Sequence, residues 1–273
     1  PLTYLYLGKE VTPGFQRLDL LPRLLPVYRE ILQKIASLGV EWVQIDEPIL
    51  SLDLEQPWLD SFAEAYHTLH DSSCRLLLTT YFGTVDHHLT LLKNLPVDGL
   101  HIDVSSAPEQ LESFLTEDFY GKTLSLGCID GRNIWRADLS QKLETLSQAA
   151  SRFAGELWIA PSCSLLHCPV DLALETKLEP EIKNWLAFSA QKLVEMTTLG
   201  RGLNQGRESV EAILTASDEA RRSRTESSRI HNPVVHQRVD NLTERDSQRN
   251  HPFVTRKHLQ QQRFNLPLLL TTT

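Results

Sequence analysis

The stretch Gly39-Val-Glu-Trp-Val-Gln-Ile-Asp-Glu-Pro48 decides how the rest of the chain is interpreted. A largely apolar segment, residues 40–45, follows a glycine and ends at Asp46 and Glu47, directly before a proline. Apolar segments of this length are typical of strands buried inside a parallel sheet. The carboxyl end of such a strand is where α/β proteins bind their ligands. The stretch therefore predicts a buried strand whose last residues reach a binding face.

Four further strands repeat this unit, and helices separate them. The strands are predicted at residues 75–80, 99–104, 122–127 and 156–160, and the helices at 57–70, 87–95, 108–115 and 139–153. Another helix precedes the first strand and is expected to start near Leu25, because Pro22 and Pro26 disfavour an earlier start. Strands that alternate with helices in this way indicate a parallel sheet with helices outside it.

The alternation stops after Cys168. The apolar spacing predicts one continuous helix over residues 179–199 and a second over 205–222. Residues 221–263 are rich in Arg, Gln, Ser, Asn and His and contain few large apolar residues, which is typical of an exposed helical or partly irregular linker. Acidic residues interleave with its arginines, which disfavours a nucleic-acid-binding arm.

Composition excludes several classes of partner. The formal net charge of −8 argues against nucleic acid or an anionic membrane surface. The chain has no apolar run near the roughly 20 residues that span a bilayer. Its four cysteines lack the spacing of a small secreted domain, which favours a reducing cytoplasm. We therefore expect a cytoplasmic protein that binds neither nucleic acid nor membrane.

Every predicted strand ends in polar or ionisable residues. These are Asp46-Glu47, Thr79-Thr-Tyr-Phe82, Asp103-Val-Ser-Ser106, Cys128-Ile-Asp-Gly-Arg-Asn133 and Pro161-Ser-Cys-Ser164. Burying such groups without partners costs free energy, so their recurrence predicts a shared binding face.

Each candidate at this face has a structural alternative. Asp46 and Glu47 are a metal-binding or acid/base pair, or they bond loop amides. Asp103 is a ligand carboxylate, or it caps the helix that follows. Arg132 is an anion contact, or simply part of a tight turn. Cys163 lies near a histidine and another cysteine, but a structural zinc site needs four ligands and no second pair follows, so we predict no metal site in this chain.

Five long motifs together resemble one enzyme family. They are Glu41-Trp-Val-Gln-Ile-Asp-Glu-Pro48, Leu76-Leu-Leu-Thr-Thr-Tyr-Phe82, Gly131-Arg-Asn-Ile-Trp-Arg-Ala-Asp138, Ser162-Cys-Ser-Leu-Leu-His167 and Arg229-Ile-His-Asn-Pro233. On these motifs, and over essentially its whole length, the chain resembles the cobalamin-independent methionine synthases.

The resemblance implies a fold and a domain division. The family has two (β/α)8 barrels, and this chain resembles a fragment: a partial TIM barrel of about five parallel strands followed by a helical linker. Residues 1–220 would be the C-terminal portion of the first barrel, and residues 221–273 the interdomain linker. The closing run, residues 271–273, resembles the threonines that precede the second barrel.

The resemblance also implies the chemistry of the whole enzyme. The family transfers the methyl group of 5-methyltetrahydropteroyltriglutamate to homocysteine, uses zinc and needs no cobalamin. Its zinc ligands belong to the second barrel. If the two barrels are duplicates, Thr79 and Tyr81 stand where the zinc His and Cys would be, and Asp103 and Cys163 stand where the other two ligands would be. Two of these four groups bind zinc poorly, so we expect no zinc on this chain.

For this chain alone, the resemblance implies a role in substrate binding and not in catalysis. Asp46 would match an aspartate that binds the homocysteine amino group in the second barrel, but we expect no catalytic residue here. We predict Asp46, Asp103 and Arg132 as substrate-binding residues of the cleft, with Arg132 and Arg136 as contacts for the anionic folate tail. The chain is expected to be monomeric and inactive in methyl transfer by itself.

Two alternatives belong to other classes. The first is a stand-alone, non-catalytic module that binds a folate-like ligand at the mouth of the barrel. The second is an unrelated barrel enzyme, such as a decarboxylase that uses Asp46 and Asp103, which would make the motif matches accidental.

Overall fold

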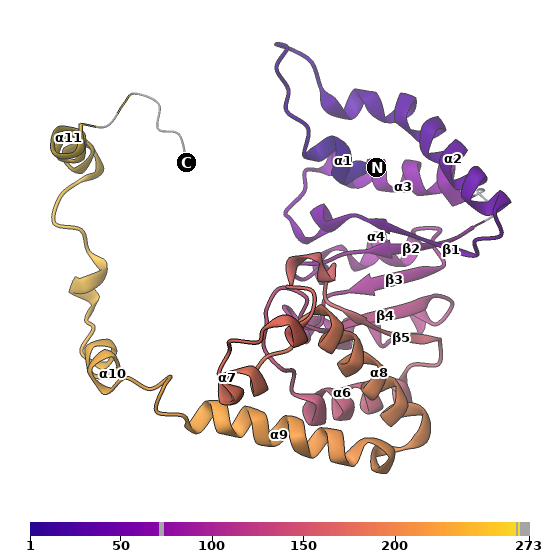
Figure 1. Ribbon diagram of the computed structural model, residues 1–273. Helices are drawn as coiled ribbons and strands as arrows, with labels where there is room; N and C mark the ends of the chain where they lie inside the picture. Colours follow the sequence, from indigo (N-terminus) through magenta and orange to yellow (C-terminus); the bar gives the residue numbers. More distant parts are fainter. Residues whose placement is uncertain (71–73, 266, 268–273) are drawn as a thin grey trace. The chain divides into compact units, whose positions relative to one another are not determined.

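Five parallel strands form a single sheet with the order β1-β2-β3-β4-β5 (Figure 1). A computed structural model describes residues 1–70, 74–265 and 267. The strands are β1 (Trp42–Asp46), β2 (Arg75–Thr79), β3 (Gly99–Ile102), β4 (Thr123–Ile129) and β5 (Leu157–Pro161). Each strand pairs in parallel with the next one along the chain. The predicted α/β fold with about five parallel strands is confirmed, and the sheet is not closed into a full barrel.

Helices connect the strands and continue beyond them. They are α1 (Leu2–Tyr6), α2 (Leu21–Ser37), α3 (Gln56–His70), α4 (Leu89–Asn94), α5 (Leu111–Phe114), α6 (Leu139–Arg152), α7 (Pro180–Asn184), α8 (Ser189–Gln205), α9 (Glu211–Glu226), α10 (Pro233–Asp240) and α11 (Phe253–Phe264). In Figure 1, α2 and α3 lie at the β1 end of the sheet, and α6 and α8 lie at the β5 end.

The core lies between the sheet and these helices. Leu76 and Leu78 of β2 are fully buried and belong to the same apolar cluster as Phe62 of α3. All seven residues of β4 are buried. The apolar run Leu76-Leu-Leu78 of β2 is typical of a strand in a parallel sheet, and such runs made the strands recognisable in the sequence.

The sheet curls strongly enough for its two outer strands to touch across the inner face. The rings of Trp42 on β1 and Trp158 on β5 meet edge to face, with centroids 4.7 Å apart. Such pairs stabilise by about 0.5–1.5 kcal/mol beyond the area that they bury. This curvature is what a partial barrel requires, although β1 and β5 are not neighbours in the strand order.

Two predictions about helices are wrong. Helix α2 starts at Leu21 rather than near Leu25, since Pro22 fits the first turn and burial of Leu21 and Leu25 offsets the hydrogen bond lost at Pro26. The single helix predicted over residues 179–199 is interrupted.

The interruption has a clear cause. Helix α7 ends at Asn184, and Leu186 forms an antiparallel bridge with Trp135 in the loop that follows β4. Arg136 N donates to Trp185 O at 2.9 Å, and Ala187 N donates to Ile134 O at 2.8 Å. The apolar spacing is therefore helical in both α7 and α8, but tertiary hydrogen bonds hold the residues between them in a different conformation.

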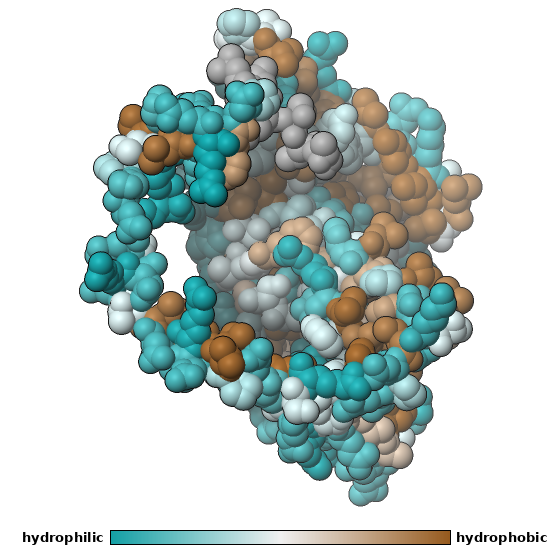
Figure 2. Space-filling view, turned by 60° about the vertical axis from the view of Figure 1, so that its left-hand side comes forward, coloured by the Kyte–Doolittle hydropathy of each residue, from teal (hydrophilic) through white to brown (hydrophobic). Residues whose placement is uncertain are grey.

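The chain divides into two contact units, residues 1–224 and 225–273. The second unit contains α10 and α11, and large apolar residues such as Val234 and Val254 are exposed there. Exposed apolar residues also occur on the first unit, and in Figure 2 they interrupt a largely hydrophilic surface. The proposed boundary at residue 220 stays a prediction, and the threonine run at 271–273 lies outside the described residues.

None of the helices in the described ranges combines the length and the apolar character needed to cross a membrane.

Inside the curled sheet, Gly127 of β4 makes room for a buried histidine of β3. A Cβ at Gly127 would lie 2.9 Å from His101 Nε2 and 2.8 Å from the backbone Cα of Ser162. Ser162, the residue after β5, is held close to β4 because its N donates a hydrogen bond to Ile129 O at 2.7 Å. The absence of a side chain at Gly127 is thus a packing requirement.

We predict that Gly127→Ala destabilises the protein by about 1–3 kcal/mol, the usual cost of overpacking a core. The measurement is the free energy of unfolding from urea titration. Gly121→Ala is the matched control, since a Cβ there meets no atom within 4 Å, and it should change stability by less than about 0.5 kcal/mol. Equal effects of the two substitutions would contradict the packing argument.

Candidate functional site

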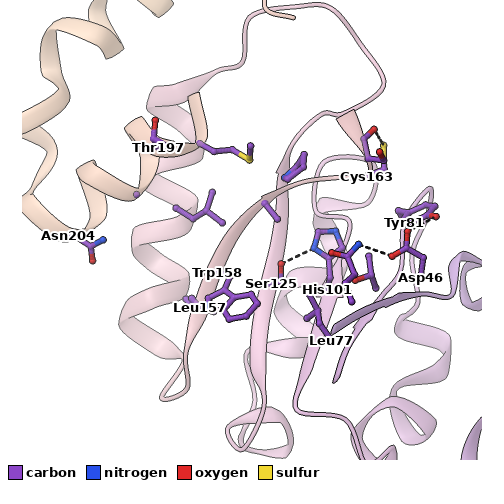
Figure 3. A pocket seen from close by; sticks show the side chains of 18 residues that line it. Asp46, Leu77, Tyr81, His101, Ser125, Leu157, Trp158, Cys163, Thr197 and Asn204 are labelled. Atoms are coloured by element: carbon purple, nitrogen blue, oxygen red, sulfur yellow. Dashed lines mark hydrogen bonds between the residues drawn. The ribbon is translucent and has the colours of Figure 1, made fainter. Parts of the chain in front are cut away.

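A cavity of about 770 Å³ occupies the inner face of the sheet (Figure 3). Residues from all five strands and from α8 line it, among them Asp46, Thr79, Tyr81, His101 and Cys163. In Figure 3, Asp46 and Tyr81 lie on one side of the cavity, and Thr197 and Asn204 of α8 lie on the other. The predicted binding face therefore coincides with a real depression that reaches the strand ends.

Asp46 lies exposed in this cavity at the end of β1. Its Oδ1 accepts a hydrogen bond from Gln44 Nε2 at 2.7 Å, and its Oδ2 accepts one from the Tyr81 hydroxyl at 3.2 Å. The pKa of Tyr81 is raised to about 12. Partial burial is the largest cause, and the negative charge of Asp46 is the second largest. Asp46 and Tyr81 thus form a polar pair that a ligand in the cavity can reach.

Glu47, the neighbour of Asp46, points away from the cavity and is fully buried. Its Oε1 accepts a hydrogen bond from Leu2 N at 2.9 Å, and its Oε2 accepts one from Thr3 N at 2.6 Å. A carboxylate at the first turn of a helix satisfies backbone donors that have no partner within the helix. Glu47 therefore anchors α1, and the structure separates the two adjacent carboxylates into a structural one and an accessible one.

Asp103 is also fully buried, at the end of β3. Its Oδ1 accepts from Ser105 N at 3.0 Å and Ser106 N at 2.8 Å, and its Oδ2 accepts from Phe82 N at 3.1 Å. Asp103 does not line the cavity. Its hydrogen bonds support the turn after β3 and the turn after β2, whereas its role as a direct ligand contact stays a prediction.

Phe82, whose amide Asp103 holds, has an unusual backbone conformation. Its φ is +74°, in the left-handed region that bulky residues rarely adopt. Such a conformation costs about 1–3 kcal/mol and persists only where the surroundings impose it. The ring is 41% exposed, and it contacts Tyr81 and His167 edge to face, at centroid distances of 4.6 and 5.8 Å. The strained turn thus presents an aromatic ring beside Tyr81, which lines the cavity.

Arg132 covers this ring, with its guanidinium carbon 4.4 Å from the Phe82 centroid. The turn that carries Arg132 is fixed by Asp130, whose Oδ1 accepts from Arg132 N and whose Oδ2 accepts from Asn133 Nδ2, both at 2.7 Å. Buried Lys192 of α8 extends this network by donating to Asn133 Oδ1 at 3.2 Å. The turn predicted at residues 130–133 is therefore real, and it places Arg132 over the Phe82 ring, outside the set of residues that line the cavity.

The three predicted site residues are thus connected through the turn after β2. Asp46 bonds Tyr81, Asp103 bonds the backbone of Phe82, and Arg132 stacks on the Phe82 ring. The sequence indicated the individual strand ends, but the role of residues 81 and 82 in joining them follows only from the fold.

His101 and Ser125 are cavity residues that the sequence analysis missed. His101 Nδ1 lies 2.9 Å from Ser125 Oγ on the neighbouring strand, and burial lowers the pKa of the imidazole. Both residues lie inside predicted strands, whereas the candidate residues were taken from the strand ends. The alternation of polar and apolar residues in 99–104 and 122–127 was the available sign that one face of each strand lines a cavity.

The residues at this end of the sheet do not fit a metal site. Among the residues that the structure describes, no group of three or more His, Cys, Asp or Glu side chains is placed to hold a metal ion. The oxygens of Asp103 are taken by backbone amides, and the Tyr81 hydroxyl donates to Asp46. Burial also raises the pKa of the Cys163 thiol, which disfavours the thiolate that would bind a metal.

Comparisons with known proteins give a consistent picture. Residues 1–154 match the family model described as the N-terminal domain of cobalamin-independent synthase. The whole chain is 97% identical to a 5-methyltetrahydropteroyltriglutamate–homocysteine methyltransferase of Nitrosomonas europaea, of which it covers 36%. It is 52% identical over 275 aligned residues to the enzyme of that name from Actinobacillus pleuropneumoniae and 50% identical over 273 to that from Coxiella burnetii, covering 36% and 35% of them. The chain therefore spans little more than a third of the length of these relatives.

Substitutions at Asp46 and Glu47 test whether the first carboxylate is accessible and the second is structural. Glu47→Ala removes a buried carboxylate and leaves two backbone N–H groups without acceptors, so we expect a loss of about 2–4 kcal/mol in the free energy of unfolding. Asp46→Asn, at the exposed neighbour, should change it by less than about 0.5 kcal/mol. Urea titration of both variants is the measurement, and a larger effect at Asp46 would refute this assignment.

The Asp46–Tyr81 pair predicts a pH dependence. Because the folded-state pKa of Tyr81 is raised above its ordinary value of 10 to about 12, the folded protein holds a proton that the unfolded chain loses. This contribution to stability is complete below pH 10 and is lost as the pH rises toward about 12. The measurement is the difference in tyrosinate absorbance between the wild type and Tyr81→Phe, and Asp46→Asn should move this titration to lower pH. An unchanged titration would show that Asp46 does not act on Tyr81.

Proposed function

Because the chain belongs to the cobalamin-independent methionine synthase family, we propose that the full-length protein transfers the methyl group of 5-methyltetrahydropteroyltri-L-glutamate to L-homocysteine, forming L-methionine. The observation that carries this proposal is the 97% identity, over every residue of the chain, to a relative of that name.

The proposed role of this chain within the enzyme is to bind and position substrate. Its accessible ionisable groups at the strand ends are Asp46 and Arg132, while Glu47 and Asp103 are occupied by backbone amides. A carboxylate attracts an ammonium group and a guanidinium attracts carboxylates. The rim can thus hold parts of both proposed substrates without taking part in bond making.

Zinc is proposed as the cofactor of the full-length enzyme, without cobalamin, and we place its ligands outside this chain. The support is that the side chains at the corresponding strand ends are unsuited to the metal. Thr79 has a buried hydroxyl with no partner among the described residues, and the pKa of Cys163 is raised. Neither group supplies the anionic ligand that zinc prefers.

A cytoplasmic location and a monomeric state complete the proposal. All four cysteines are free thiols and are buried, which fits a reducing compartment.

The proposal predicts that activity requires more than this chain. We expect the full-length protein to transfer radiolabelled methyl from 5-methyltetrahydropteroyltriglutamate to homocysteine, and residues 1–273 alone to give no labelled methionine above the rate without protein. Absence of transfer by the full-length protein would refute the function. Turnover by residues 1–273 alone would instead refute the assignment of all catalytic groups to the rest of the enzyme.

A further inference from the structure

A second cavity, of about 170 Å³, lies between the loop after β4 and helices α8 and α9. It shares no lining residue with the cavity on the inner face of the sheet. At about 30 Å³ for each water molecule, it has room for about five waters. Cavities that hold drug-sized ligands start at about 300 Å³. This second cavity therefore suits a small metabolite and takes no part in the site described above.

Glu195 of α8 lines this second cavity and is only 6% exposed. Its Oε1 accepts a hydrogen bond from Ala137 N at 2.9 Å. Its Oε2 is buried without a hydrogen-bond partner among the described residues. Buried polar atoms in folded proteins almost always have a partner, because leaving one unpaired costs free energy. A donor is therefore missing at this oxygen.

The cations near Glu195 do not pair with it. Lys192, one turn earlier on α8, donates instead to Asn133 Oδ1 at 3.2 Å and to Trp135 O at 3.3 Å. None of the ion pairs between described residues involves Glu195. Burial is the largest effect on the Glu195 carboxyl and raises its pKa, although its hydrogen bond and nearby cations lower it in part. The carboxylate thus lacks a full positive counterpart.

Arg136, in the loop after β4, supplies a second open group in the wall of the cavity. Its backbone N donates to Trp185 O at 2.9 Å. Within residues 1–70, 74–265 and 267, its half-buried guanidinium has no hydrogen bond, ion pair or ring contact. A guanidinium recognises a carboxylate through two parallel N–H donors. The wall thus combines an acceptor without a donor and a cation without an anion.

The other polar side chains of the wall are engaged with the protein. Thr198 Oγ1 donates to a backbone carbonyl of its own helix at 2.8 Å, and Ser217 Oγ donates to Ala137 O at 2.8 Å. The Gln191 amide bonds residues 171–172 through both its oxygen and its nitrogen, at 3.0 and 2.8 Å. A ligand therefore meets two open charged groups rather than a general polar surface.

Apolar side chains complete the wall. Leu139, Leu186 and Ala187 are buried, whereas Val194 of α8 and Ile213 of α9 are 59% and 37% exposed. An apolar group in the cavity would remove part of this exposed surface from water, which is favourable. The cavity thus offers one acceptor, one cation and an apolar contact within a small volume.

We propose that this cavity binds an α-amino acid with a short apolar side chain. Its ammonium group donates to Glu195, its carboxylate accepts from Arg136, and its side chain lies against the apolar wall. A zwitterion supplies in one small molecule both the donor and the anion that the wall lacks. A simple amine would leave the guanidinium unpaired, and a simple carboxylate would leave Oε2 without a donor. This site is additional to the proposed methyl transfer and does not depend on it.

The first test is equilibrium dialysis of the full-length protein against radiolabelled L-leucine. L-Leucine is preferred to L-methionine, because the product of the proposed reaction would also bind at the reaction site. We expect saturable binding that L-methionine displaces. The analogues 4-methylpentanoate, which lacks the ammonium group, and 3-methylbutylamine, which lacks the carboxylate, should each compete at least about 10-fold more weakly than unlabelled L-leucine. Absence of saturable binding, or equal competition by the analogues, would overturn the inference.

The second test locates the site with Glu195→Gln and Arg136→Gln. Glu195→Gln keeps an oxygen for the Ala137 amide and loses the charge, so the fold is expected to survive, which circular dichroism checks. Each substitution should weaken L-leucine binding about 10–100-fold, the range for one charge-assisted contact. The control is Arg201→Gln, an exposed arginine of α8 that lines neither cavity, which should change binding less than about 2-fold. Unchanged binding in both cavity variants, or an equal loss in the control, would refute the site.

Discussion

The buried carboxylate of Asp103 organises the ligand end of the sheet. It accepts three backbone N–H groups, two from the turn after β3 and one from Phe82 in the turn after β2. Hydrogen bonds to a buried carboxylate are stronger than neutral ones, so together they can hold Phe82 in a conformation that it would not adopt alone. The stacking of Arg132 and the position of Tyr81 beside Asp46 both follow from this turn. One carboxylate without direct access to the cavity thus determines what the cavity rim presents.

Four of the acidic or basic groups predicted at the strand ends divide into two kinds. Glu47 and Asp103 are buried and committed to backbone amides, whereas Asp46 and Arg132 remain accessible. This division is physically reasonable, because a buried charge needs full hydrogen-bonding compensation and a ligand-binding charge must keep part of its capacity free. The same motif, Asp46-Glu47-Pro48, contains one member of each kind. Its first residue lines the cavity, and its second holds the first turn of α1.

Much of the fold was predictable because short segments rich in apolar residues alternate along the chain with segments of helical period. All five strands were placed to within a few residues for this reason. The helix over 179–199 was mispredicted because Trp185 and Ala187 form hydrogen bonds with a loop about 50 positions earlier in the chain. Local periodicity carries no information about such a distant contact. The direction of Glu47, the stacking of Arg132 and the pairing of His101 with Ser125 are likewise contacts between distant segments. The sequence could identify these residues as candidates, but only the fold assigns their partners.

The central claim is that the buried carboxylate of Asp103 fixes the turn after β2 and thereby the ligand end of the sheet. The most direct measurement is a crystal structure of the full-length protein with Asp103→Ala, which removes the acceptor of all three backbone amides. The account predicts that Phe82 leaves its left-handed conformation and that its ring separates from the Arg132 guanidinium. A variant in which Phe82 keeps a φ near +74° and its contact with Arg132 would contradict it.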